Sequence, residues 1–244
     1  MTYYVDMHCH LHELVEEYGV DILDNYSREY IIVAVSDDLS SSLKTLELRE
    51  KYSFIKPCIG IHPWSIGETP ENHLEEIERI VSEKDIVCLG EIGLDTRFVR
   101  ETIDKQRMFF QKFLEIAREY NLVLNLHTAG TWREVLDLLI RYDIDKAFFH
   151  WYTGPKTLLE EITSYGYYIG ANPAWKIQKK HREILGDISL DIVVTESDAP
   201  YKYRGLEMKP ELVRDTIEFL AETHGVSKSY VIDRIYYNFS RLLR

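Results

Sequence analysis

The sequence predicts an α/β fold, a closed (β/α)8 TIM barrel, and three observations lead to this prediction. Eight short runs rich in Val, Ile, Phe and Tyr alternate with longer segments of helical spacing. Several runs are apolar almost throughout, as strands covered on both faces are. Polar side chains gather where the runs end, which is typical of the active face of a parallel barrel. We therefore expect residues 1–244 to form one barrel domain, a length usual for this fold.

The expected strands follow one another along the chain without a break in the alternation. They are Tyr3–His8, Ile31–Ser36, Phe54–His62, Ile86–Leu94, Leu122–His127, Lys146–Trp151, Tyr167–Asn172 and Ile192–Ser197. A doubly wound open sheet is the alternative fold. The loop after the first strand lacks the G-x-G-x-x-G pattern, so a dinucleotide site of the Rossmann type is not expected.

The intervening segments carry apolar side chains three and four positions apart, as amphipathic helices do. One stripe consists of Leu74, Ile77 and Val81, and another of Phe109, Phe113, Ile116 and Ala117. Thr69 before Pro70 predicts a helix N-cap followed by proline at the first helical position. The pair at positions 154 and 155, Gly-Pro, predicts the start of a helix through residues 158–162.

Composition narrows the classes of protein to which the chain can belong. A net charge of −12 disfavours broad, non-specific binding to nucleic acid, although bound divalent cations can make a cleft locally positive. Cys9, Cys58 and Cys88 lack a C-x-x-C pair, and we expect free, buried thiols in a reducing compartment. No signal peptide or membrane span is evident, so we expect a cytoplasmic, soluble protein without an obligatory protein partner.

The side chains at the strand ends form a set of metal ligands. His8 and His10 are two apart, which places both imidazoles on one side of an extended strand, with Cys9 pointing away. Glu91, His127, His150 and Asp198 follow at the ends of later strands. We expect His8, His10 and Asp198 to hold one divalent ion, His127 and His150 a second, and Glu91 to bridge the two. Mixed nitrogen and oxygen ligands favour Zn²⁺ or Mn²⁺ over Mg²⁺.

A single histidine at a strand end is more often a structural residue than a ligand. We apply that interpretation to the histidines outside the pattern, which are His12, His73, His181 and His224. It fits poorly for four histidines and two acids at five strand ends. A buried carboxylate such as Glu91 is costly unless it is paired or bound to a metal.

With these residues in place, the chain resembles the TatD family of metal-dependent deoxyribonucleases, which are amidohydrolase-like barrels. The shared motifs are D-x-H-x-H at residues 6–10, G-x-H-P at 60–63, G-E-x-G-L-D at 90–95, E-T-D-x-P-Y at 196–201, with serine at the second position here, and N-x-x-R at 238–241. The resemblance implies a two-metal site with the same ligands. No lysine ends the fourth strand, which argues against the carboxylated-lysine branch of these barrels.

Two segments depart from the family pattern, and both would border the pocket. The family often has H-x-R after the fifth strand, whereas residues 127–130 read H-T-A-G and the nearest arginine is Arg133. The family's H-x-F-S-G is H-W-Y-T-G at residues 150–154. An arginine missing from a phosphate clamp weakens the expectation of DNA as the substrate.

The function expected first is hydrolysis of a phosphodiester, in DNA or in a small phosphodiester or ester substrate. A pair of ions lowers the pKa of a shared water, so that hydroxide forms at neutral pH. We expect Asp198 and Glu91 to be catalytic, and His62, Arg204 and Glu196 to contact the substrate. A second role for Glu196 is to orient a ligand.

Two other functions stay open. A metal-dependent amidohydrolase or esterase would use the same chemistry on a small molecule, and a barrel retained for binding would have no activity. The basic segment 174–186 follows the seventh strand, and it either guides a polyanion to the site or is an ordinary exposed helix. We expect Asn238 and Arg241 to anchor the last helix.

Overall fold

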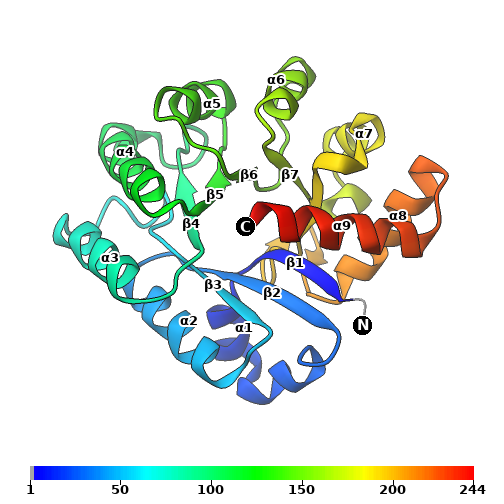
Figure 1. Ribbon diagram of the computed structural model, residues 1–244, viewed down its shortest axis with the longest axis horizontal. Helices are drawn as coiled ribbons and strands as arrows, with labels where there is room; N and C mark the ends of the chain where they lie inside the picture. The colour runs from blue at the N-terminus through cyan, green and yellow to red at the C-terminus, as the bar shows by residue number, and fades with distance from the viewer. Residues whose placement is uncertain (1–2) are drawn as a thin grey trace.

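The computed structural model describes residues 3–244, and its centre is one sheet of eight parallel strands. Each strand pairs with the next along the chain, in the order β1 to β8, and helices surround the sheet (Figure 1). The strands are β1 Tyr4–Cys9, β2 Tyr30–Val35, β3 Ile55–Ile59, β4 Cys88–Gly93, β5 Val123–His127, β6 Ala147–Phe149, β7 Tyr168–Ala171 and β8 Val193–Thr195. This order confirms the predicted (β/α)8 barrel and excludes the doubly wound sheet, in which the strand order would reverse.

The first and last strands meet and complete the barrel. The Asp198 N–H donates to the His8 carbonyl oxygen at 2.8 Å, and the His10 N–H donates to the Ala199 carbonyl oxygen at 2.8 Å. These bonds join the carboxyl end of β1 to the segment that follows β8. The seam therefore brings together residues from the two ends of the domain at the face where the predicted ligands lie.

The helices lie where the periodicity predicts them. The α-helices are α1 Leu11–Tyr18, α2 Leu39–Lys51, α3 Asn72–Glu83, α4 Ile103–Tyr120, α5 Trp132–Arg141, α6 Leu159–Ser164, α7 Lys179–Asp187, α8 Leu212–His224 and α9 Lys228–Leu242. Both predicted apolar stripes, on α3 and α4, are buried. A short hairpin that the sequence did not predict, β9 Lys202–Tyr203 with β10 Leu206–Glu207, follows β8.

The predicted start of α3 is wrong by a few residues. The helix begins at Asn72 with Glu71 at the N-cap position, and Thr69 and Pro70 precede it. The Thr69 hydroxyl donates to the Ser65 carbonyl oxygen at 2.8 Å, so it belongs to the preceding turn. By contrast, the predicted start near position 155 is confirmed, because a 3₁₀ turn at Lys156–Leu158 leads directly into α6.

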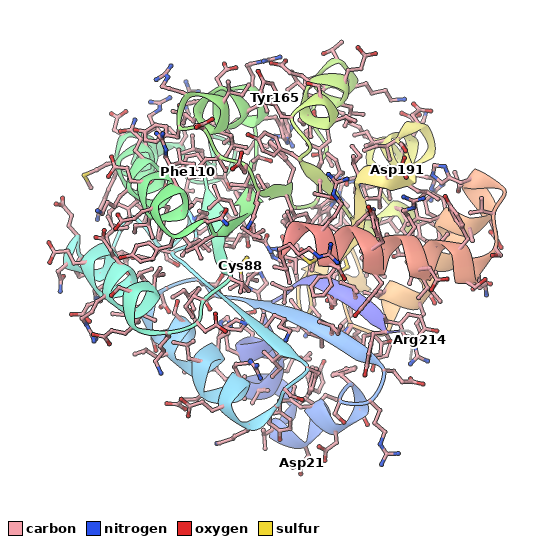
Figure 2. All side chains as sticks on the ribbon, viewed as in Figure 1. Asp21, Cys88, Phe110, Tyr165, Asp191 and Arg214 are labelled. Atoms are coloured by element: carbon pink, nitrogen blue, oxygen red, sulfur yellow. A yellow bond between two sulfur atoms is a disulfide. The ribbon has the colours of Figure 1, made fainter. Side chains whose placement is uncertain are left out.

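The expectation of three free thiols is wrong for two of the cysteines. Cys58 and Cys88 form a disulfide, with their Cα atoms 4.5 Å apart. They are register partners on the neighbouring strands β3 and β4. Their separation of 30 positions in the sequence gave no sign of the pairing. Cys9 is free and buried, as expected. Figure 2 shows Cys88 near the middle of the barrel and Asp21 at its periphery.

The last helix is anchored as expected for one of its two predicted residues. The buried Asn238 amide donates to the carbonyl oxygens of Leu190 at 2.8 Å and Val193 at 2.7 Å, which ties α9 to the start of β8. Arg241 lies on the exposed side of the same helix. None of the helices in residues 3–244 is both long enough and apolar enough to cross a membrane.

Candidate metal centre

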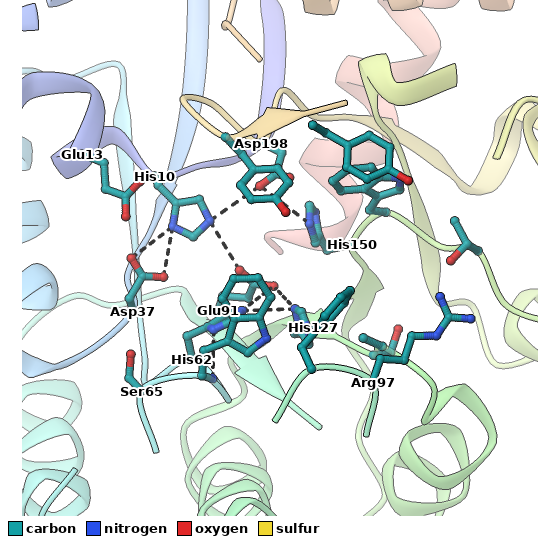
Figure 3. A pocket seen from close by; sticks show the side chains of 18 of the residues that line it. His10, Glu13, Asp37, His62, Ser65, Glu91, Arg97, His127, His150 and Asp198 are labelled. Atoms are coloured by element: carbon teal, nitrogen blue, oxygen red, sulfur yellow. Dashed lines mark hydrogen bonds and ion pairs between the residues drawn. The ribbon is translucent and has the colours of Figure 1, made fainter. Parts of the chain in front are cut away.

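The six predicted ligands meet at one end of the barrel, each at or just beyond the carboxyl end of its strand. Figure 3 shows five of them, His10, Glu91, His127, His150 and Asp198, around one cavity of about 420 Å³. His8 lies beneath them, fully buried. Residues that span most of the sequence share this pocket because parallel strands of a barrel end on the same face.

Glu91 occupies the middle of the cluster. Its Oε2 lies 3.3 Å from His8 Nε2 and 3.5 Å from His10 Nε2, while its Oε1 lies 2.8 Å from His127 Nδ1 and 3.4 Å from His62 Nε2. Burial acts to raise the pKa of the Glu91 carboxyl, but the surrounding imidazoles outweigh it and hold that pKa well below its usual range. Glu91 is therefore an ionised carboxylate with an oxygen toward each half of the cluster.

His8, His10 and Asp198 form the first group of possible ligands. The Nε2 atoms of the two histidines are 3.2 Å apart, and Asp198 Oδ1 lies 3.6 Å from each. Asp198 has a φ of 58°, a left-handed conformation that is uncommon outside glycine and costs on the order of 1 kcal/mol. The Asp198 N–H bond to His8 holds it there. The three residues thus aim their donor atoms at one point, as predicted.

His127 and His150 are not brought into one group, although the sequence predicted that they share an ion. His127 lies with His62 and Glu91, whereas His150 lies with His8 and Glu91, each set within 4.8 Å. The His150 ring stacks on His8 with centroids 3.6 Å apart. Burial, together with the neighbouring His8, lowers the pKa of His150 to about 3, so its ring is neutral and available as a donor.

Polar partners on the far side of the His8 and His150 imidazoles fix the orientation of these two rings. Asn125 Oδ1 lies 2.8 Å from His8 Nδ1, and Glu196 Oε2 lies 2.9 Å from His150 Nδ1. Such partners fix the tautomer, so that the Nε2 atom faces the site. Burial raises the pKa of Glu196 to about 7. The fully buried Glu196 also accepts the Trp151 N–H at 2.8 Å, which places it behind His150 and away from the cavity.

Asp37 is a second such partner that sequence reasoning missed. It follows β2, and its carboxylate lies 3.1 Å from both His10 Nδ1 and His12 Nε2. Burial acts to raise the pKa of Asp37, but His10 and His12 reverse the effect and lower it. His12, interpreted from the sequence as structural, therefore supports the carboxylate that holds His10. The acid at the end of the second strand was the available signal, because the polar ends of six other strands contribute to this pocket.

Of the three predicted substrate contacts, His62 borders the cavity, whereas Glu196 and Arg204 do not, so the prediction is wrong for these two. His62 lines the cavity, 3.1 Å from His127 Nδ1. Arg204 lies in the turn between β9 and β10, outside the lining of the cavity, with its guanidinium over Tyr203. Arg133, the arginine nearest to the incomplete H-x-R motif, pairs with Glu161 at 2.7 Å and does not line the cavity either.

The arginine that does line the cavity is Arg97, which sequence reasoning missed. Its guanidinium carbon lies 5.1 Å from the centroid of the Trp132 ring, and both residues border the pocket. Aromatic side chains make up much of the remaining rim, and they are Trp64, Phe98, Trp151, Tyr201 and Tyr203.

Comparison with known proteins places the chain among relatives that match it from end to end. The family profile described as TatD related DNase matches residues 5–244. A protein of Methanocaldococcus jannaschii named as an uncharacterized metal-dependent hydrolase is 30% identical over 241 residues, covering 96% of this chain and 94% of that protein. The human protein named deoxyribonuclease TATDN3 is 26% identical over 248 residues, covering 94% of this chain and 90% of its own.

A solved structure supports the fold in the same way. The crystal structure of a TatD homolog from Escherichia coli K12 superposes with a TM-score of 0.88 at 21% identity, covering 98% of this chain and 97% of that one. The family profile covers nearly every residue of the chain, and the relatives match it over almost their whole length. The chain belongs to the TatD-related DNase family of metal-dependent hydrolases.

Proposed function

We propose that the protein is a deoxyribonuclease that hydrolyses phosphodiester bonds in DNA with a pair of divalent cations. The observation that carries the proposal is the gathering of His8, His10, Glu91, His150 and Asp198 into two overlapping groups of possible metal ligands, which share His8, at the mouth of the barrel. The family profile, described as TatD related DNase, directs the choice of bond. Fold alone does not distinguish a phosphodiester from an ester or an amide.

The donor atoms suit divalent cations. Two imidazole nitrogens that face each other at 3.2 Å, as those of His8 and His10 do, repel unless a proton or a cation lies between them. We propose that His8, His10 and Asp198 would hold one cation and that His127 would hold the other, with His150, which stacks on His8, lying nearer the first. Glu91 contributes an oxygen to each. Bound Zn²⁺, Mn²⁺ or Mg²⁺ supplies a Lewis acid and lowers the pKa of water.

The chain's own residues hold the site together and move the proton. Asp198 Oδ1 lies within 3.8 Å of three imidazoles and borders the cavity, so it is our candidate for the base that takes a proton from the attacking water. Asn125 and Glu196 keep His8 and His150 turned toward the cavity. His62, which lines the cavity beside His127, is our candidate for contact with a phosphoryl oxygen.

The test combines metal content with a panel of substrates. Purified protein is assayed by elemental analysis, then with added Mn²⁺ on single-stranded DNA, a simple phosphodiester, an ester and an amide. We expect about two bound divalent ions and cleavage of the two phosphodiesters. Asp198→Asn should lower that cleavage by about a hundredfold or more.

Two results contradict the proposal, and they do so differently. Cleavage of only the ester or the amide replaces it with hydrolysis of a small molecule. Protein that binds no metal and cleaves nothing on the panel favours the third function, a barrel retained for binding.

A further inference from the structure

The rim of the cavity carries two large aromatic side chains that are exposed side by side. Phe98 is 67% exposed and Trp64 is 46% exposed, and their ring centroids are 5.7 Å apart at an interplanar angle of 70°. Both line the same cavity as the candidate ligands. Exposed apolar side chains that adjoin a polar pocket are a feature of ligand sites. Phe98, the more exposed of the two, is accessible to a planar group.

A buried carboxylate fixes this pair relative to the metal centre. Asp95 is fully buried, and its Oδ1 accepts the N–H groups of Arg97 at 2.7 Å and Phe98 at 2.9 Å. Its Oδ2 accepts the Trp64 indole N–H at 2.6 Å and lies 3.0 Å from His127 Nε2. One side chain therefore holds both aromatic residues, the Arg97 turn and a candidate metal ligand, so the rim is a built feature and not a loose loop.

Two cations near Trp132, one of them the neighbour of Phe98 in the sequence, have no acidic partners. The Arg97 guanidinium carbon and Lys180 Nζ lie 5.1 Å and 5.6 Å from the centroid of the Trp132 ring. Across residues 3–244, no carboxylate forms an ion pair with either side chain. Other cations of this chain, whose net charge is −12, pair with carboxylates, for example Lys176 with Asp215 at 2.6 Å. A guanidinium with free donors suits a phosphate oxygen.

We propose that Trp64, Phe98 and Arg97 form a subsite for one nucleotide unit of the substrate. The base stacks on the exposed Phe98 ring, Trp64 bounds it from the side because the two rings are inclined at 70°, and Arg97 binds the phosphate of the same unit. Stacking on an aromatic side chain needs the free face of an unpaired base. This inference rests on the proposed phosphodiester hydrolysis and adds a base-binding subsite to it.

Two esters with the same leaving group separate base recognition from catalysis. The Mn²⁺-loaded enzyme is assayed on thymidine 5′-(p-nitrophenyl phosphate), which carries a base, and on methyl p-nitrophenyl phosphate, which does not. We expect the wild-type protein to prefer the thymidine ester in kcat/KM. Phe98→Ala should reduce that preference by about five- to a hundredfold, mainly through KM, because one stacked base contributes that much. Activity on the methyl ester is the reference, because any general effect of the substitution on the site cancels in the ratio of the two kcat/KM values.

Matched variants control for surface effects and for charge. Tyr237→Ala removes an aromatic side chain that is 52% exposed on α9 and does not line the cavity, so it should leave the preference unchanged. Arg97→Met should raise KM for both esters by about tenfold, and Arg97→Lys should restore part of the loss. Binding of thymidine 5′-monophosphate by calorimetry provides a readout that does not depend on turnover.

The outcomes keep this inference apart from the proposed function. If both esters are cleaved and Phe98→Ala leaves their ratio unchanged, the subsite is overturned and the hydrolase assignment stands. If neither ester is cleaved but Phe98→Ala weakens binding of the nucleotide, the subsite stands and the proposed function fails. Equal nucleotide binding by the wild-type and Phe98→Ala proteins overturns the subsite in either case.

Discussion

Glu91 is 2% exposed and contacts four histidines, whereas Phe98, at the rim of the same cavity, is 67% exposed and packs edge-on against Trp64. In the first region, a buried carboxylate is surrounded by imidazoles that compensate its negative charge. The second is an open surface fixed from below by Asp95. Changes in the first region should therefore have large effects that salt does not screen, and changes at the rim should be smaller and depend on the substrate.

The largest effect should come from removing the charge at the centre of the cluster. Glu91→Gln leaves the shape almost unchanged but takes away the anion shared by the imidazoles. We expect loss of bound metal by elemental analysis and a fall in kcat on the order of a thousandfold. Glu160→Gln, on an exposed part of α6, is the control and should match wild type. A Glu91→Gln protein that keeps its metal and a tenth of its activity would contradict the charge-balance interpretation.

His181 tests what burial does without a carboxylate partner. It is fully buried between the Asn172 N–H and the Tyr152 carbonyl oxygen, and burial lowers its pKa from 6.5 to about 4. Between these pH values the unfolded chain binds a proton that the native chain does not. The stabilisation is therefore complete above pH 6.5 and is lost as the pH falls toward 4, by at most about 3 kcal/mol.

Urea unfolding at several pH values measures this contribution. His181→Gln should flatten the dependence of the unfolding free energy on pH between 4.5 and 6.5. His224→Gln, a partly exposed histidine on α8, should keep the wild-type slope. An unchanged slope in the His181 variant would assign the acid sensitivity to other groups.

A smaller effect is expected from the carboxylate behind His10. Asp37→Asn weakens the bond that orients His10 and leaves every predicted ligand in place. The affinity for metal, measured by competition with a chelator, should fall by about ten- to a hundredfold. Ser65→Ala, which alters the lining of the same cavity, should have no effect on it. Unchanged affinity in Asp37→Asn would reduce Asp37 to a structural residue.

The smallest effect belongs to the rim. Lys180→Met removes one of the cations over Trp132 and should lower kcat/KM on a single-stranded oligonucleotide by about two- to threefold at low salt. The slope of log kcat/KM against log salt should fall by about 0.7, as for one lost phosphate contact on a single strand. Lys179→Met, whose ammonium pairs with Glu183 at 3.7 Å, should change neither value. Identical salt slopes for the two variants favour an ordinary exposed helix for residues 174–186.

Much of the fold was predictable because the strands are short apolar runs and a parallel barrel orders them as the chain does. The same rule placed His8, Glu91 and Asp198 at one face without any knowledge of side-chain contacts. It failed for partners that depend on three-dimensional register. The pairing of Cys58 with Cys88 is set by adjacent strands and has no local signal in the sequence.

The surroundings of the site were harder to predict than its ligands. Asn125 lies in the interior of β5 and reads as an ordinary strand residue until the fold sets it beside His8. Arg97 and Arg204 both follow polar strand ends, yet the Asp95 turn directs one to the cavity and the β9–β10 hairpin takes the other away. Loops follow no simple periodicity, so their side chains cannot be placed from spacing alone.

The seam between β1 and β8 has a consequence for biosynthesis. His8 leaves the ribosome early. Asp198, whose N–H donates to the His8 carbonyl oxygen at this seam, follows 190 positions later. At about 5–20 residues per second, translation separates the two by roughly 10 to 40 s. On the ligand set proposed above, a half-made chain lacks His150 and Asp198. We therefore expect a nascent chain to bind the cation only after β8 has joined the barrel.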